Sequence, residues 1–171
     1  YKEKGWNDPH AVGYMESHDE ERLMYKNIEF GNSTSSYDTR ELNTALERKE
    51  LASVFFYMIP GPKMLWQFGE LGYDFSINRC VNGTVNPNCR LDPKPIRWDY
   101  KENLQRKQLY DVTAAMIKFK TEYDLTKTTN YVHSLGEGKK FLRLNSDDLN
   151  AVVMGNFEVG ARSLSPGFQH T

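Results

Sequence analysis

The sequence predicts an α/β fold that continues into antiparallel β strands. Two short apolar segments, residues 11–17 and 63–69, each lead into polar residues, as buried strands do. An amphipathic helical pattern follows each of them, and after residue 125 the periodicity changes to short strand-like runs separated by turns. The order strand, helix, strand, long loop, helix is typical of two successive βα units of an α/β sheet or barrel.

The first predicted strand ends at an unusual concentration of polar side chains. It is apolar from Val12 to Met15 and stops at a histidine and several carboxylates within residues 16–22. Reactive groups of α/β barrels stand at the C-terminal ends of strands, so this position favours an active site. Residues 24–38 contain the turn-forming run GNSTSSYD and are predicted to form a loop.

The first helix is predicted to begin near Asp38 or Thr39, with Glu41 completing a capping box, and to end at Pro60 and Gly61. Residues 47–50 are expected to face solvent. The apolar residues lie on or near one face: Leu42, Ala45, Leu46, Ala52, Phe55 and Phe56. The segment KMLWQFG then predicts a second short strand that ends near Glu70, whose neighbours Gly69 and Gly72 allow a close backbone approach to a ligand.

The connection over residues 70–103 is too long for a passive linker, so we expect it to be functional or held by a covalent cross-link. It holds the two cysteines, Cys80 and Cys89, in a stretch rich in Asn, Gly and Pro. We predict a disulfide between them, which places the protein in an oxidising compartment, secreted or periplasmic; two free thiols in a cytosolic loop are the alternative. Without a nearby histidine the pair makes a poor zinc site.

The second helix is predicted over residues 104–123, and the chain then becomes strand-like. The helix has one apolar stripe: Leu109, Val112, Met116, Phe119 and Tyr123. The runs NYVHSL, KKFLRLN and NAVVMGNF are predicted strands separated by polar turns. We therefore place a domain boundary near residue 129, dividing residues 1–129 from residues 130–171.

Composition excludes several classes of partner. The formal net charge is −1 and the basic residues are scattered, which argues against a nucleic acid or an anionic membrane surface. No stretch approaches the roughly 20 apolar residues of a membrane span. Aromatic residues make up 13% of the chain, which suits either stacking on sugars or an aromatic core.

Two segments resemble strand motifs of the α-amylase family of glycoside hydrolases. YMESHDEERL resembles the seventh-strand motif, an apolar run followed by Glu-Asn-His-Asp, a polar residue and Arg-Leu. IPGPKMLWQFGELGYD resembles the eighth-strand motif, a Pro-Gly-x-Pro turn, an apolar strand and Gly-Glu. The resemblance implies that residues 1–129 are the last βα units of a TIM (β/α)8 barrel and that residues 130–171 begin a C-terminal β-sandwich domain.

The resemblance also implies roles for individual residues. Asp19 corresponds to the family's third catalytic carboxylate, which binds sugar hydroxyls and stabilises the oxocarbenium-like transition state. His18 would donate a hydrogen bond to the same sugar, and Ser17 stands where the family has Asn. Arg22 is expected to orient nearby carboxylates or to form a surface ion pair.

Four further residues complete the predicted site and its surroundings. Glu70 is expected to be structural or loop-orienting rather than catalytic. Trp98 is the predicted sugar platform, whereas Trp66, on an apolar segment, is predicted to lie in the core. Glu20 and its neighbour Glu21 are expected to face solvent.

The implied reaction is the retaining hydrolysis of α-1,4-glucans such as starch and maltooligosaccharides. Retention needs a nucleophile and an acid/base about 5 Å apart, and the family carries them on the fourth and fifth barrel strands. We therefore expect an active longer parent and an inactive isolated chain, which should self-associate through exposed strand edges. No cofactor or metal ligand is assigned to this chain, because the family's structural calcium binds elsewhere.

Two alternatives stay open. One is a branching or transglycosylating enzyme of the same family, because the strand motifs do not distinguish these reactions. The other is a non-catalytic saccharide-binding protein with an amylase-like barrel. An intact upstream pair of Asp and Glu favours the enzyme, and apolar or basic replacements favour the binding protein.

Overall fold

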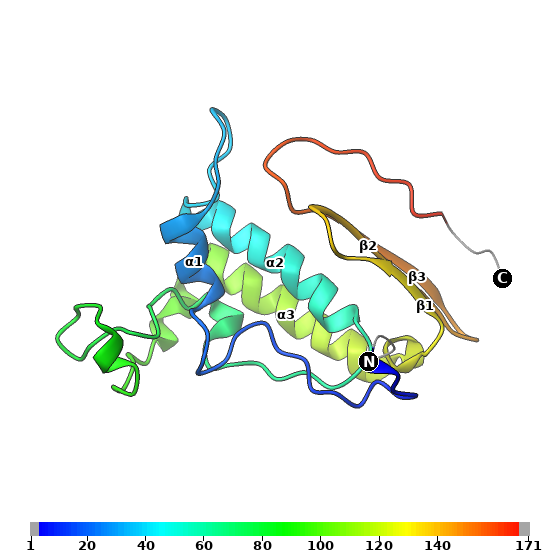
Figure 1. The fold of residues 1–171 in the computed structure, drawn as a ribbon, viewed down its shortest axis with the longest axis horizontal. Helices are drawn as coiled ribbons and strands as arrows, with labels where there is room; N and C mark the ends of the chain where they lie inside the picture. Colours follow the sequence, from blue (N-terminus) through cyan, green and yellow to red (C-terminus); the bar gives the residue numbers. More distant parts are fainter. Residues whose placement is uncertain (1–3, 168–171) are drawn as a thin grey trace. The chain divides into compact units, whose positions relative to one another are not determined.

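The computed structural model describes residues 4–167. Figure 1 shows the helices and strands of this part of the chain. The helices are α1 (Leu23–Phe30), α2 (Leu42–Met58) and α3 (Leu104–Glu122), and the strands are β1 (Tyr131–Ser134), β2 (Lys139–Asn145) and β3 (Asn150–Asn156). Short 3₁₀ helices lie between them: η2 (Gly69–Leu71), η3 (Pro87–Cys89), η4 (Trp98–Glu102) and η5 (Asp124–Lys127).

The chain divides into two compact units. Unit 1 contains the residues up to Gly13, the stretch Leu51–Met64 and the residues from Val112 onward; unit 2 contains Tyr14–Glu50 and Leu65–Asp111. The first part of α2 and of α3 belongs to unit 2 and the last part of each to unit 1. The boundary near residue 129 divides the sequence differently and stays a prediction.

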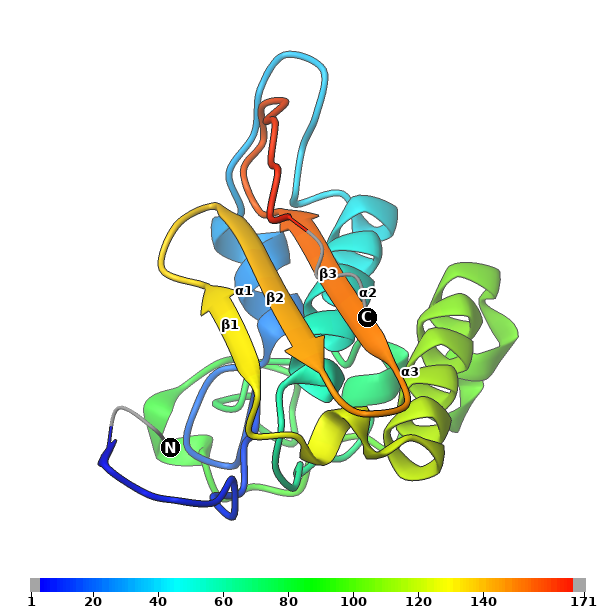
Figure 2. The same ribbon diagram turned by 90° about the vertical axis from the view of Figure 1, so that its right-hand side faces the viewer.

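The sheet of unit 1 is antiparallel, and β2 lies between β1 and β3 (Figure 2). Its strands match the three predicted runs. Leu142 and Leu144 are two residues apart, so their side chains point to the same face of the sheet. Both are fully buried, in one cluster with Phe55 and Met58 of α2 and Leu125 of η5. The sheet is therefore held by a core that includes residues from α2 and η5.

Two helices agree with the prediction and one was not predicted. α3 matches the expected range within one residue. α2 begins at Leu42, later than expected, because Asp38 forms a turn ahead of it: its carboxylate accepts from the Arg40 N–H at 2.9 Å. The prediction that residues 24–38 form a loop is wrong for their first part, which is α1. Met24 and Ile28, one turn apart, pack in the core of unit 2.

The two predicted parallel strands are reduced to one bridge. Gly13 pairs with Lys63 in parallel, and the Gly13 backbone accepts from Met64 N–H and donates to the Pro62 carbonyl, both at 2.9 Å. Beyond the bridge Tyr14 is half exposed, and Phe68 turns the chain with a φ of 58°. Strand predictions for 11–17 and 63–69 are therefore wrong in extent. A parallel strand is stabilised by neighbours and by covered faces, and these segments meet one another at a single position.

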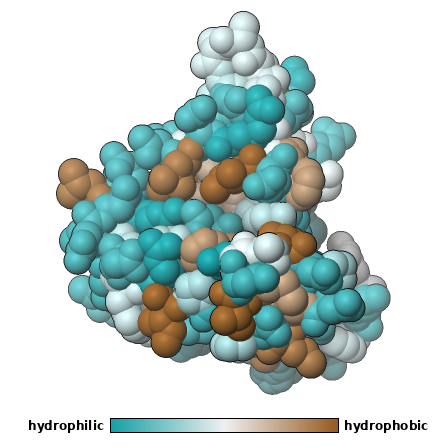
Figure 3. Space-filling model, turned by 90° about the vertical axis from the view of Figure 1, so that its left-hand side faces the viewer, coloured by the Kyte–Doolittle hydropathy of each residue, from teal (hydrophilic) through white to brown (hydrophobic). Residues whose placement is uncertain are grey.

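The surface is mixed in polarity. On the face shown in Figure 3, hydrophobic side chains form small groups separated by hydrophilic ones. No helix within residues 4–167 is long and apolar enough to cross a membrane.

Candidate functional site

The predicted site residues Ser17, His18, Asp19 and Arg22 lie in unit 2, in the segment that precedes α1. His18 and Asp19 are exposed, with side-chain exposures of 72% and 68%. Glu16, Ser17 and Arg22 on either side of them are buried. The segment therefore presents an imidazole and a carboxylate to solvent while its flanking residues anchor it.

Glu16 is the centre of that anchor. Its carboxylate accepts from the Lys49 ammonium at 3.0 Å, from the Leu23 backbone N–H at 2.9 Å and from the Arg22 guanidinium at 3.4 Å. Burial alone would raise the pKa of Glu16, but Lys49, the Leu23 N–H and Arg22 outweigh it, and the pKa lies below its ordinary value. Glu16 therefore stays ionised and ties the segment to the N-terminus of α1 and to α2.

The other side of this buried group is aromatic. The Arg22 guanidinium lies over the ring of Tyr73 at 4.8 Å and over that of Trp66 at 5.6 Å from the ring centroids. Arg22 is only 5% exposed, so the alternative that it forms a surface ion pair is wrong. Its contact with Glu16 agrees with the predicted role of orienting a carboxylate.

The exposed part of the site brings three side chains together. His18 Nε2 lies 3.4 Å from Asp19 Oδ2, and the imidazole lies 6.0 Å from the Trp66 ring, centroid to centroid, at a tilt of 47°. Trp66 is half-buried, so the prediction that it lies in the core is wrong. The turn itself is held by Ser17, whose hydroxyl accepts from the Asp19 N–H at 3.1 Å and donates to the Glu20 carboxylate.

Arg90 also contacts Asp19, although no sequence pattern points to this residue. Its guanidinium donates to the Asp19 backbone carbonyl and lies 3.5 Å from Asp19 Oδ1. Arg90 follows Cys89 directly, and Cys89 is joined to Cys80 in a disulfide with the two Cα atoms 4.9 Å apart. The residue directly after the disulfide loop (residues 80–89) therefore places a cation beside the exposed carboxylate.

Glu21 holds the first part of the long connection over residues 70–103. Its carboxylate accepts from the Ser76 hydroxyl at 2.6 Å, the Ile77 N–H at 2.8 Å and the Asn78 side-chain amide at 3.4 Å. The expectation that Glu21 faces solvent is wrong, because three donors more than 50 residues away use it. Glu20 is likewise only partly exposed.

Neither Glu70 nor Trp98 has a contact to Asp19 among the described residues. Burial lowers the pKa of Lys49, while Glu16 and, more weakly, Glu70 act to raise it. An added Cβ at Gly69 would lie 2.5 Å from Glu16 Oε1, so the close approach at this glycine is to the buried carboxylate. Trp98 is 60% exposed and packs edge-on against Phe68 at 4.8 Å. The roles of Glu70 and Trp98 stay predictions.

Lys49 and Arg90 were not selected from the sequence, and only Lys49 has a sequence pattern that could have identified it. Lys49 was expected on the solvent side of α2 and is 3% exposed, so that expectation is wrong. Its position has a signal, because Ala45, Lys49 and Ser53 repeat every four residues along the buried side of the helix. Arg90 has no such signal, since its partner is 71 residues away.

The described residues contain one group with the spacing of metal ligands, Cys80, Cys89 and Asp92. Both sulfur atoms of this group are consumed by the disulfide. We therefore assign no metal to the site.

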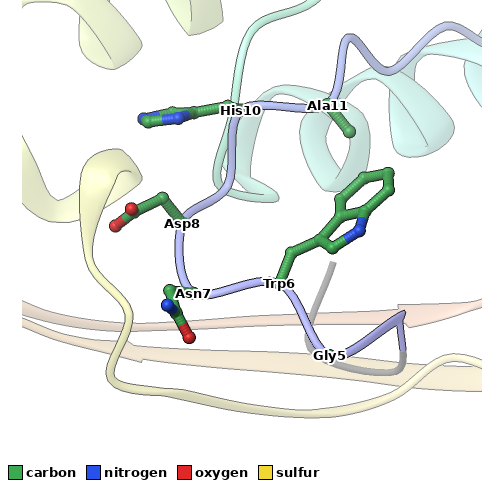
Figure 4. Close-up of a pocket in the computed structure, with 6 residues that line it drawn as sticks. All are labelled: Gly5, Trp6, Asn7, Asp8, His10 and Ala11. Atoms are coloured by element: carbon green, nitrogen blue, oxygen red, sulfur yellow. The ribbon is translucent and has the colours of Figure 1, made fainter.

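Unit 1 has a separate hollow near its first described residues. Figure 4 shows Asp8 and His10 pointing to one side of this segment, whereas Trp6 points away from them. The hollow has a volume of about 610 Å³, and the His10 N–H donates to the Asp8 carbonyl at 2.9 Å. It is wide and open, and its side chains diverge, so it does not bring reactive groups to one point.

The arrangement in unit 2 suits a sugar. A carboxylate accepts hydrogen bonds from hydroxyl groups, an imidazole donates one, and an aromatic ring supplies a flat apolar surface. No family model matches the chain, and no curated protein matches it. Functional assignment therefore depends on the geometry around Asp19 and on the resemblance of the two strand motifs.

Proposed function

We propose that this chain is part of an α-amylase-like glycoside hydrolase that cleaves α-1,4-glucans with retention, and that Asp19 is its transition-state-stabilising carboxylate. One observation supports this most directly: His18 and Asp19 are exposed beside Trp66 while the segment that carries them is anchored by a buried ion pair. A reactive group needs such support, because small displacements from the productive geometry cost much of its effect.

The chemistry assigned to Asp19 follows from its charge and exposure. As a glycosidic bond breaks, positive charge develops on the sugar ring. A fixed carboxylate near that charge binds the transition state more strongly than the ground state and so lowers the barrier. His18 donates to a hydroxyl of the same sugar, and Trp66 offers a face to the ring or to its neighbour.

The barrel is supported by a smaller observation. The bridge between Gly13 and Lys63 is parallel, as expected of neighbouring strands in a (β/α)8 barrel. The nucleophile and the acid/base belong to strands that the two motifs do not include. The proposal therefore concerns a longer protein and assigns no hydrolysis to the 171-residue chain alone.

The proposed cellular location is supported by the two cysteines. The disulfide between Cys80 and Cys89 is compatible with an oxidising compartment. Together with a polymeric substrate, it leads us to assign the protein to the periplasm or the exterior of the cell.

The test is reducing-sugar release from soluble starch by a chain extended upstream through the fourth strand. We expect Asp19→Asn to lower kcat by about 10²-fold or more, with an unchanged circular dichroism spectrum. Asp38→Asn is the matched control, because Asp38 is also a partly exposed carboxylate that pairs with an arginine in unit 2.

Two results would contradict the proposal. Starch hydrolysis by the pure 171-residue chain would show that the upstream carboxylates are unnecessary. A well-folded extended wild type that binds maltohexaose without cleaving it would replace the hydrolase with the non-catalytic saccharide-binding protein.

A further inference from the structure

We infer that Arg90 is a substrate-binding residue that acts with Asp19 as a donor–acceptor pair for two adjacent hydroxyl groups of one sugar ring. The inference rests on the proposed function and deepens it: the ligand is a pyranose with free vicinal hydroxyls, and Arg90, directly after the disulfide loop, supplies one of the two groups that hold it.

Arg90 and Asp19 contact each other through one nitrogen of the guanidinium. Both described contacts of the Arg90 side chain use Nη2, one with the Asp19 carbonyl and one, at 3.5 Å, with Oδ1. The Arg90 side chain is 40% exposed and that of Asp19 is 68% exposed. A guanidinium has five N–H donors, so Nε and Nη1 keep donors for a ligand.

The donor and acceptor of this pair match the hydrogen-bonding groups of a sugar. Each sugar hydroxyl both donates and accepts a hydrogen bond, so a neighbouring pair can donate to Asp19 and accept from Arg90 at the same time. An isolated carboxylate offers acceptors only and would bind an ammonium or a cation equally well. The adjacent guanidinium repels cations, and the pair is therefore selective for a neutral ligand that carries both functions.

The backbone next to Arg90 is held by a disulfide and by the Lys94 side chain. Cys89, directly before it, is held on one side by the disulfide to Cys80. On the other side, the Lys94 ammonium donates to the carbonyls of Cys89 at 2.8 Å and of Arg79 at 2.9 Å. A surface ion pair alone contributes little because two long side chains must be ordered to form it. Here the backbone that carries Arg90 is already ordered, so less freedom is lost on binding.

The positioning is tested first without any saccharide. In ¹⁵N-resolved NMR spectra of the 171-residue chain, Arg90→Gln and the double variant Cys80→Ser/Cys89→Ser should both shift the amide signals of Asp19 and of the following residue. Arg40→Gln is the control, because it breaks a comparable exposed pair with Asp38 elsewhere in unit 2. Unchanged Asp19 signals in both test variants would overturn the positioning by the disulfide loop.

The binding role is tested on the upstream-extended chain with maltohexaose. We expect Arg90→Gln to raise KM, or the Kd measured by calorimetry, about tenfold, with kcat within about threefold of the wild type. Arg90→Lys should recover part of the loss, because it keeps the charge but not the planar donors. A structural defect would instead lower kcat and thermal stability together.

The outcomes separate this inference from the proposed function. If Asp19→Asn abolishes hydrolysis and Arg90→Gln leaves KM unchanged, the inference is wrong and the hydrolase stands. If the extended chain binds maltohexaose without cleaving it, the hydrolase is wrong, and the Kd of Arg90→Gln decides the inference. If the wild type binds no maltohexaose, both are wrong.

Discussion

Replacing Lys49 by Met should lower the stability of this protein far more than the position of Lys49 in a charged stretch of α2 suggests. Met has nearly the same length and fills the same space, so packing is conserved. The substitution removes the closest cationic partner of Glu16, whose side chain is 4% exposed. The Glu16 carboxylate then keeps the Leu23 N–H and the more distant Arg22 only.

The expected cost follows from that loss. Removing one partner of a buried ion pair costs 3–5 kcal/mol, because the other charge stays buried without compensation. Two contacts to Glu16 remain, so we expect a value near the lower end, about 3 kcal/mol. For a chain of this length that corresponds to a fall in Tm of roughly 6–12 °C. The double variant Glu16→Gln/Lys49→Met should be no more stable than Lys49→Met alone, because losing the carboxylate leaves the buried Arg22 guanidinium without its nearest anionic partner.

Urea unfolding at pH 7, followed by circular dichroism, measures these differences. Lys107→Met is the control: Lys107 pairs with Asp111 on the exposed side of α3, and its loss should cost at most about 0.5 kcal/mol. The pKa of Glu16 is lower when the protein is folded, so its contribution is present above its ordinary pKa of 4.5 and is lost as the pH falls through the folded value. Equal costs for Lys49→Met and Lys107→Met would refute the reasoning.

Three further results are expected from the same unfolding experiments. Cys80→Ser/Cys89→Ser should destabilise the chain by about 3 kcal/mol, the loop-closure entropy of the ten-residue loop, and reduction of the wild type should give the same value. Glu21→Ala should cost about 1.5–3 kcal/mol because it deprives three donors of their acceptor, whereas Glu29→Ala, on the exposed surface of α1, should change little. Burial lowers the pKa of Lys63 from 10.5 to about 8, so the wild type should gain stability relative to Lys63→Met as the pH rises between these values; a constant difference would contradict this.

The parts of the fold that could be predicted are those fixed by local periodicity. α3 has a helical pattern along its length, and the three strands are short strand-like runs bounded by turns. All four elements occur where expected. α1 was missed although Met24 and Ile28 have helical spacing, because its first N–H is capped by Glu16, seven residues upstream, and not by a local capping residue. The two predicted parallel strands depend on neighbours, and a pattern within one segment does not specify these.

The candidate site divides in the same way. His18 and Asp19 could be found because a short motif contains both of them. Lys49 carried a detectable signal, its position on the buried stripe of α2, but a charged residue inside a charged run was assigned to solvent. Arg90 and the partners of Glu21 could not be found, since each contact joins residues more than 50 positions apart. Such contacts exist only after the chain has folded.

The segment that carries Asp19 is anchored by the buried ion pair of Glu16 and Lys49. An apolar cluster of the same volume would bury the segment at least as favourably, because replacing a buried ion pair by apolar residues is often neutral or stabilising. Apolar contacts are not directional, however, and they would leave the backbone at Glu16 free to slide or rotate. The directional hydrogen bonds from Lys49 and the Leu23 N–H hold the Glu16 carboxylate, and through it the chain three residues before Asp19. We therefore expect this ion pair to orient the segment that carries Asp19 in addition to stabilising it.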